Sequence, residues 1–142
     1  MITSKQCYER YGASDLEKAM QVWHVPETLQ IATIPKRIYC NKDLVEPLHE
    51  ALHNIRERDR GVLVKSWDGC FNIRRKRGAA SMSLHSWGVA IDINAAWNRF
   101  GQKPTIPMAL VKCFTDAGFE WGGYWSVPDG MHFQLAEFPV VS

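Results

Sequence analysis

The sequence predicts an α+β fold, with a small, mostly antiparallel sheet and helices packed against it. Helix-like and strand-like segments follow one another without the regular strand–helix–strand rhythm of parallel α/β proteins. Residues 88–94 and 131–136 alternate apolar and polar side chains, as half-buried strands do. Residues 43–58 instead repeat apolar side chains at helical spacing. The 142 residues can bury a core without disulfides, and we expect one domain over 1–142.

The first expected helix covers residues 14–25. It opens with a capping box, because Glu17 follows Ser14 at the required spacing, and Pro26 closes it. The remaining elements are expected as a strand at 37–40, a helix at 43–58, strands at 61–67 and 88–94, a helix at 106–118 and a strand at 131–136.

Local signals define the later boundaries. Residues 68–83 are polar and flanked by glycine, which predicts a loop. Pro107 suits the first turn of the next helix and Gly118 suits its end. The sequence "PDG" at 128–130 predicts a turn before the last strand.

Composition excludes several classes of protein. The net charge of +2 is too small for a dedicated nucleic-acid binder, so we expect no nucleic-acid partner. The one dense basic run, "RRKR" at 74–77, is either a solvated loop or a site for an anionic substrate. No 18-residue apolar run occurs, so we expect no stable membrane association. The four cysteines form no C-x-x-C pair, which argues against a ribbon or finger-type zinc site.

The N-terminal sequence "MITSKQCYERYG" lacks the apolar region of a secretory signal. We therefore expect synthesis in the cytoplasm, and any role outside it would need another exit route. A monomer is the expected oligomeric state.

One motif suggests a zinc peptidase directly. "HEALH" at 49–53 matches H-E-x-x-H, which presents two zinc ligands and a glutamate base from one helix. However, His49 and His53 lie outside the apolar stripe of that helix and are expected to face solvent. Arg56 also occupies the position where a glycine would turn the chain toward a third ligand. We interpret this helix as scaffold.

A second set of residues fits a metal site better. His85 lies at the end of a loop, Asp92 on the polar face of a strand, and His132 at the start of another strand. Two imidazoles and a carboxylate supply zinc with three ligands and leave a fourth position open for water. Asp129, in the turn before His132, is placed to act as a general base. A Cys70–His85 nucleophile pair is an alternative, but it leaves Asp92 and His132 unexplained.

Two longer motifs resemble a known family. "SLHSWGVAID" at 83–92 matches the S-x-H-x-x-G-x-A-x-D signature of the VanY-like metallopeptidases. These include D-alanyl-D-alanine carboxypeptidases and dipeptidases and the phage L-alanyl-D-glutamate endopeptidases. "GFEWGGYWSVPDGMHFQL" at 118–135 is similar to their closing motif. "NKDLVEPLHEAL" and "WDGCFNIRRKRG" resemble the phage lysis-enzyme branch. Residues 1–35 carry little resemblance and are expected to form an N-terminal helix packed on the domain.

The resemblance implies a role for each site residue. His85, Asp92 and His132 would bind one zinc ion, with Asp129 as the catalytic base. The family uses an arginine before the first histidine to bind substrate and steady the oxyanion; Arg74 and Arg77 are both available, and we favour Arg74. Another substrate contact is expected from the signature serine, Ser83. Four aromatic side chains would either line a groove and contact substrate or pack in the core: Trp87, Trp121, Tyr124 and Trp125.

The resemblance also implies a fold and a function. The fold would be the zinc domain that hedgehog proteins share with the D,D-peptidases. The activity would be hydrolysis of a peptidoglycan stem-peptide amide, with an L-alanyl-D-glutamate endopeptidase acting as a phage endolysin as the favoured form. Such an enzyme would reach the cell wall through membrane holes made by another protein, a holin. Two alternatives are a D,D-carboxypeptidase or D-Ala-D-Ala dipeptidase, and a non-catalytic zinc-stabilised binding module.

Overall fold

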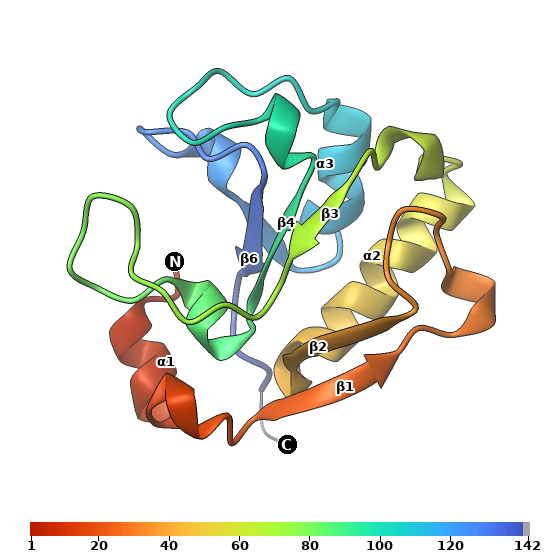
Figure 1. Ribbon diagram of the computed structural model, residues 1–142. Helices are drawn as coiled ribbons and strands as arrows, with labels where there is room; N and C mark the ends of the chain where they lie inside the picture. Colours follow the sequence, from red (N-terminus) through yellow and green to blue (C-terminus); the bar gives the residue numbers. More distant parts are fainter. Residues whose placement is uncertain (141–142) are drawn as a thin grey trace.

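The structure, a computed structural model, describes residues 1–140 and confirms the α+β class (Figure 1). Within these residues the helices are α1 (Ser4–Tyr11), α2 (Val45–Glu57) and α3 (Met108–Thr115). The strands form two antiparallel sheets, a two-stranded one and a four-stranded one with the order β3-β4-β6-β5. Their bounds are β1 (Met20–His24), β2 (Arg37–Asn41), β3 (Trp67–Gly69), β4 (Ala90–Ile93), β5 (Phe119–Trp121) and β6 (His132–Leu135).

The central pair of the larger sheet sets the positions of the polar side chains. β4 and β6 pair so that Ile91 lies opposite Phe133 and Asp92 lies opposite His132. Because directly paired residues share a face of a sheet, the apolar pair points one way and the polar pair the other. The predicted strands at 88–94 and 131–136 are thus confirmed, with shorter bounds.

The core fills the apolar side of this sheet. α2 and α3 contact each other and lie behind the sheet in the view of Figure 1. Leu48 and Leu52 of α2 are fully buried, as the apolar stripe predicted. The ring of Phe114 on α3 packs against that of Phe133, with centroids 4.7 Å apart. The helices therefore hold the sheet from one side and leave the face with Asp92 and His132 free for chemistry.

The helix expected at 14–25 is wrong. Only a short 3-10 turn forms at Ser14–Leu16, and Glu17 then takes a left-handed conformation with φ of 50°. The following residues form β1 and pair with β2, placing Val22 opposite Tyr39. The local capping signal predicts a helix, but pairing with β2 decides the conformation of residues 20–24. This pairing cannot be recognised from the residues of the segment alone.

The strand expected at 61–67 is also largely wrong. Residues 61–63 form a 3-10 turn, and β3 begins only at Trp67. A further strand, β5, lies in the segment that the sequence left unassigned after α3 and pairs with β6. β3 and β5 are short strands at the two edges of the sheet. At such positions pairing with a neighbouring strand, rather than the residue pattern, decides the conformation.

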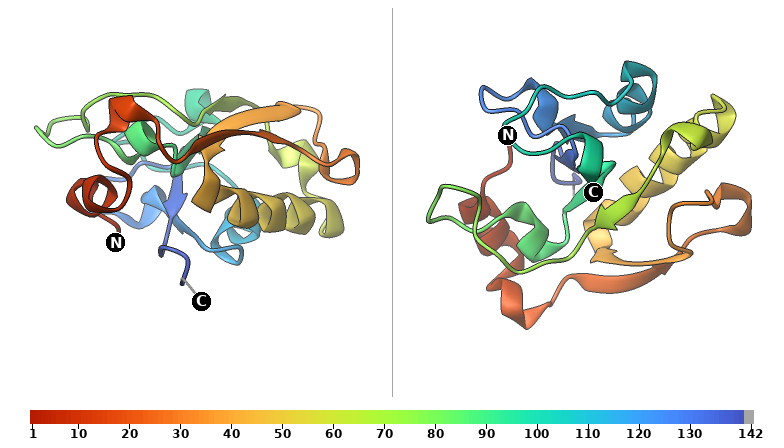
Figure 2. Two further views of the ribbon diagram at one scale, coloured as in Figure 1. Left: turned by 90° about the horizontal axis from the view of Figure 1, so that it is seen from below. Right: turned by 45° about the horizontal axis from the view of Figure 1, so that its top comes forward.

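The N-terminal segment supports the site from the side. α1 begins with a capping box formed by Thr3 and Gln6, and it contacts the 3-10 turn Leu84–Trp87, as Figure 2 also shows. The indole Nε1 of Trp87 donates a hydrogen bond to the Gly12 carbonyl at 2.9 Å. α1 therefore lies within residues 1–35, but it precedes residues 14–25, where the capping box predicted a helix.

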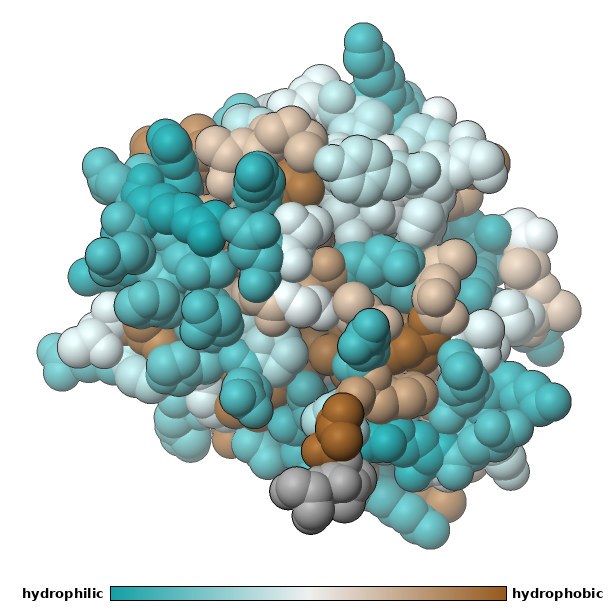
Figure 3. Space-filling model, turned by 180° about the vertical axis from the view of Figure 1, so that it is seen from behind, coloured by the Kyte–Doolittle hydropathy of each residue, from teal (hydrophilic) through white to brown (hydrophobic). Residues whose placement is uncertain are grey.

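The back of the molecule is mostly hydrophilic, with hydrophobic side chains gathered in its lower middle (Figure 3). Among residues 1–140, no helix combines the length and the apolar character needed to cross a membrane.

The core assignment can be tested on α2, where Leu52 is buried and its neighbour His53 is exposed. Leu52→Ala should lower the free energy of unfolding by about 2–5 kcal/mol, because it leaves a cavity in the hydrophobic core. His53→Ala should change it by less than about 0.5 kcal/mol. Urea denaturation followed by circular dichroism measures both, and equal effects would contradict the packing described.

Candidate metal centre

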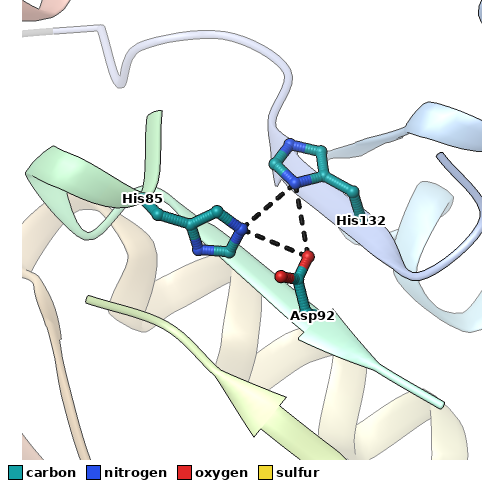
Figure 4. Close-up of side chains that lie close together, drawn as sticks. All are labelled: His85, Asp92 and His132. Carbon is teal, nitrogen blue, oxygen red and sulfur yellow. Dashed lines mark hydrogen bonds and ion pairs between the residues drawn. The ribbon is translucent and has the colours of Figure 1, made fainter. Parts of the chain in front are cut away.

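Three side chains from distant parts of the chain converge on one point (Figure 4). His85 comes from the 3-10 turn Leu84–Trp87, Asp92 from β4 and His132 from β6. Asp92 Oδ1 lies 3.1 Å from His85 Nε2 and 3.4 Å from His132 Nδ1. The two imidazole nitrogens are 3.2 Å apart.

These distances fit a single metal ion. Ligands about 2.0–2.1 Å from a tetrahedral zinc ion lie about 3.3 Å from one another, which is close to the spacing of the three atoms here. Asp92 Oδ1 is also buried and has no hydrogen bond of acceptable geometry, although both imidazoles are near. A carboxylate oxygen and two imidazole nitrogens that converge at this spacing can hold a cation between them. The three residues therefore fit a bound metal ion.

Each imidazole is oriented by a second contact. His85 Nδ1 lies 2.6 Å from the carbonyl oxygen of Cys70, and His132 Nε2 lies 2.9 Å from Gln134 Oε1. An acceptor at one ring nitrogen fixes the proton there and leaves the other nitrogen free for a metal. The free nitrogens are the two that face Asp92, so both rings are held ready to bind an ion.

The turn that carries His85 is fixed by local backbone chemistry. Ser83 is the N-cap, and its hydroxyl accepts a hydrogen bond from the His85 amide at 3.3 Å. Gly88 ends the turn with φ of 67°, a conformation that favours glycine. A Cβ at Gly88 would lie 2.9 Å from the backbone nitrogen of Asn41. The serine and glycine of the signature motif therefore shape the turn, and Ser83 also lines the cleft.

Asp129 lies beside the triad on a tight turn. Its amide donates to the Gly122 carbonyl at 2.9 Å, and a Cβ on Gly122 would lie 2.6 Å from the Asp129 carbonyl oxygen. The indole of Trp121 donates to the Gly130 carbonyl at 2.9 Å and holds the same turn. Asp129 Oδ1 is buried with no hydrogen-bond partner among residues 1–140. The carboxylate is thus held in place but not used by the fold.

The charges of the site differ between its two carboxyl groups. Burial disfavours ionisation of Asp92, but close contacts with His132 and His85 outweigh burial and hold its pKa below the ordinary value. Burial raises the pKa of Asp129, and the charge of Asp92 adds to that rise. Burial lowers the pKa of His132, yet the adjacent Asp92 carboxylate raises it overall. Asp92 is therefore charged at neutral pH, as a metal ligand must be.

Two hollows flank the triad on the polar side of the sheet. The first, which we name the basic cleft, has a volume of about 340 Å³ and reaches His132, Asp129 and Trp125. The second, the β3 hollow, has a volume of about 190 Å³ and reaches His85 and Asp92. The residues that line it are Asp68, Gly69, Cys70, Phe71, Asn72, Arg74, His85 and Asp92.

Arg74 and Arg77 occupy different places. Arg74 lines both hollows, and its guanidinium Nη2 lies 4.0 Å from Asp92 Oδ2. Its backbone is held by Ser83 and by the hydroxyl of Ser86. Arg77 lines only the basic cleft, with its guanidinium 5.7 Å from the centre of the Phe100 ring. Arg74 is therefore the arginine beside the triad.

The aromatic side chains divide between groove and core. Trp125 lines the basic cleft, and its ring centroid lies 5.3 Å from that of His132. Trp121 and Trp87 are only 6% exposed and belong to the core. Of the two places expected for Trp121, the groove and the core, the ring lies in the core, where it packs against Phe133 and Tyr124 and supports the Asp129 turn.

The alternative sites are not assembled. His49 and His53 are exposed on α2, and His49 contacts Trp23 rather than a metal ligand. The thiol of Cys70 points to the Gly88 carbonyl at 3.6 Å, and burial raises its pKa. His85 meets the Cys70 carbonyl oxygen instead of its sulfur. The H-E-x-x-H motif is confirmed as scaffold, and the Cys70–His85 nucleophile pair is wrong.

The sequence motifs did not identify two groups that orient the imidazoles, the side-chain amide of Gln134 and the backbone carbonyl of Cys70. Gln134 could have been found, because it follows His132 at the two-residue spacing that puts both on one face of β6. The Cys70 carbonyl could not, since a backbone acceptor leaves no signal in residue type.

The fold is an α+β domain, and its candidate metal site combines two histidines and one aspartate with a free carboxylate beside them. This arrangement is typical of metal-dependent hydrolases. Residues 77–135 match the family model described as D-alanyl-D-alanine carboxypeptidase. The match confirms the resemblance to the VanY-like metallopeptidases and contains His85, Asp92, Asp129 and His132. It indicates a metallopeptidase. Comparisons with curated proteins and with solved structures gave no match.

Gln134 provides a test of the metal site that leaves the ligands intact. Gln134→Met keeps the side-chain volume but removes the acceptor for His132 Nε2. Zinc affinity, measured by competition with a chromophoric chelator, should fall about 10–100-fold because the ring loses its orientation. Gln21→Met, at an exposed position on β1, should leave the affinity unchanged. Equal zinc affinity in the two variants would show that Gln134 does not orient the ring.

Proposed function

We propose that this protein is a zinc-dependent peptidoglycan hydrolase that cuts the L-alanyl-D-glutamate bond of the stem peptide and acts as a phage endolysin. The observation that carries the proposal is the metal triad with the free carboxylate of Asp129 beside it, at the head of the basic cleft. The family match supports a peptidase that acts on peptidoglycan.

Zinc is the proposed ion because two imidazoles and one carboxylate suit it and leave a position open. His85, Asp92 and His132 would hold it. When bound, such an ion acidifies water and polarises a carbonyl group. The chain's own residues then supply proton transfer, charge stabilisation and the positioning of substrate.

Asp129 is proposed to move the proton. Its carboxylate accepts a proton from the water that attacks the amide carbon, and a new C–O bond forms. The same carboxyl group then donates that proton to the nitrogen as the C–N bond breaks, so that an amine and a carboxylic acid leave. The buried, unpartnered Oδ1 of Asp129 supports this role, because no fold contact competes for it.

Arg74 is proposed to stabilise the negative charge that develops on the carbonyl oxygen. Its guanidinium lies beside the triad, and its backbone is tied to Ser83 and Ser86. A donor held in this way contributes roughly 3–4 kcal/mol of transition-state stabilisation. Arg77, further along the basic cleft, is proposed to bind substrate.

The endolysin part of the proposal draws on the segments that resemble phage lysis enzymes. Residues 41–52 lead into α2, and 67–78 form β3 and the loop that carries Arg74. The second of these segments borders both hollows, where a family branch would adapt its substrate contacts. The proposed place of action is the cell wall, reached through membrane holes made by a holin.

A D,D-carboxypeptidase is the second candidate. The description of the matching family model names this activity, and Arg74 and Arg77 could hold a terminal carboxylate. A binding module without turnover is less favoured, because such a module has no use for the free Asp129 carboxylate.

Digestion of purified sacculi tests the activity and the bond together. The protein loaded with zinc should release new L-alanine carboxyl ends and D-glutamate amino ends, identified by mass spectrometry. Asp129→Asn should keep zinc and lose about 10²–10⁴-fold in rate, because it removes the proton acceptor. Asp116→Asn, in an exposed ion pair with Arg58, should change neither. Release of free D-alanine alone would replace the endopeptidase with the carboxypeptidase.

A further inference from the structure

The two hollows beside the triad differ in charge. The basic cleft is lined by Arg74, Lys76 and Arg77, and no ion pair within residues 1–140 engages Lys76 or Arg77. Their charges are therefore free to bind anionic groups. Arg77 is partly fixed by its contact with the Phe100 ring, and Trp125 lies on the same cleft. This side of the triad suits a ligand that carries carboxylates.

The β3 hollow has the opposite character. Two carboxylates line it, those of the ligand Asp92 and of Asp68, and the Asp68 carboxylate accepts hydrogen bonds of 2.8 Å from the Ala95 amide and the Ser66 hydroxyl. Arg74 is the one cation on its lining, and it stands at the border with the basic cleft. A carboxylate deep in this hollow would face Asp68 without a nearby counter-charge. The hollow therefore suits an uncharged ligand.

Phe71 is the aromatic residue on the lining of the β3 hollow. Its ring packs edge-to-face on Tyr39 of β2, with ring centroids 5.4 Å apart. Asn72 follows Phe71 and adds an amide that can donate and accept hydrogen bonds. A fixed aromatic ring next to a neutral polar group is suited to the C–H faces and hydroxyls of a sugar.

The position of Asp129 gives the groove a direction. Asp129 lines the basic cleft and not the β3 hollow. Since this group is proposed to return the proton to the leaving nitrogen, the amine half of the cut bond lies on the basic side. The acyl half then lies across Asp92, over the β3 hollow.

We infer that the groove binds the stem peptide in one direction, with its carboxylate-bearing D-glutamate half over Lys76 and Arg77 and the muramic sugar against Phe71. This inference rests on the proposed function. In an L-alanyl-D-glutamate bond the amine half carries the free carboxylates of D-glutamate and the following residue. The acyl half is alanine joined through a lactyl group to an uncharged part of the sugar.

The same asymmetry disfavours a cut near the far end of the stem peptide. For a D-alanyl-D-alanine bond, the acyl half would carry the D-glutamate carboxylate toward Asp68 and away from the cations of the basic cleft. The amine half would be a single D-alanine, too small to use the three cations that line the basic cleft. The charge pattern therefore selects the bond close to the sugar.

Three soluble substrates separate the contribution of the sugar from that of the D-glutamate carboxylate. They are a muramyl tripeptide, the same peptide without the sugar, and the muramyl tripeptide with the free D-glutamate carboxylate amidated. We expect the wild-type protein to cut the first most efficiently. Amidation should lower kcat/KM about tenfold, because a charge-assisted contact is lost. Removal of the sugar should lower it about two- to tenfold.

The variants address each side of the triad separately. Replacing both Lys76 and Arg77 by Gln should abolish the preference for the free carboxylate, whereas Arg75→Gln, in the same loop but off the cleft, should retain it. Phe71→Leu keeps apolar volume and should abolish the preference for the sugar, whereas Tyr8→Ala, exposed on α1, should retain it. Thermal melting of each variant checks that it is folded.

Two results would overturn the inference while leaving the proposed function intact. One is cleavage between alanine and glutamate with the carboxylate preference retained in the Lys76/Arg77 variant. The other is an equal loss on substrates with and without sugar in Phe71→Leu. If the wild-type protein does not cut between L-alanine and D-glutamate in any substrate, both the inference and the proposed function fail.

Discussion

The pairing of β4 with β6 is the interaction on which the site depends. Its register puts Asp92 opposite His132 on one face and Ile91 opposite Phe133 on the other. A slip by one residue would send the polar pair into the core and the apolar pair into the groove. The helices packed behind the sheet therefore fix the chemistry as well as the fold, because burying Ile91 and Phe133 leaves the metal ligands only one direction in which to point.

Around the β4–β6 pair, the rest of the fold mainly positions the reactive side chains and adds few reactive groups of its own. The carbonyl of Cys70 and the amide of Gln134 select which imidazole nitrogens face the centre. Gly122 permits the close turn that carries Asp129. Asp129 itself is held through its backbone, so its carboxylate stays free. The result is a triad built for a cation next to one unused carboxylate, with cations gathered on one side only.

The site was predictable because its parts lie in short segments with strong local signals. His85, Asp92 and His132 were assigned from two motifs and converge as expected. The fold near the N-terminus was not predictable in the same way, since β1 forms only by pairing with β2 and its own sequence begins with a helix signal. Trp121 shows a different limit: residue type alone does not tell an aromatic ring that lines a groove from one that supports a turn.

The structure assigns the metal to the triad and not to the H-E-x-x-H helix. Zinc content of the purified protein, measured by atomic emission for His85→Ala and His49→Ala, tests this assignment most directly. His85→Ala should lose most of its zinc and its peptidase activity, because one of three ligands is gone. His49→Ala should keep both, since His49 is exposed on α2. Retention of zinc by His85→Ala together with its loss from His49→Ala would show that α2, and not the triad, binds the metal.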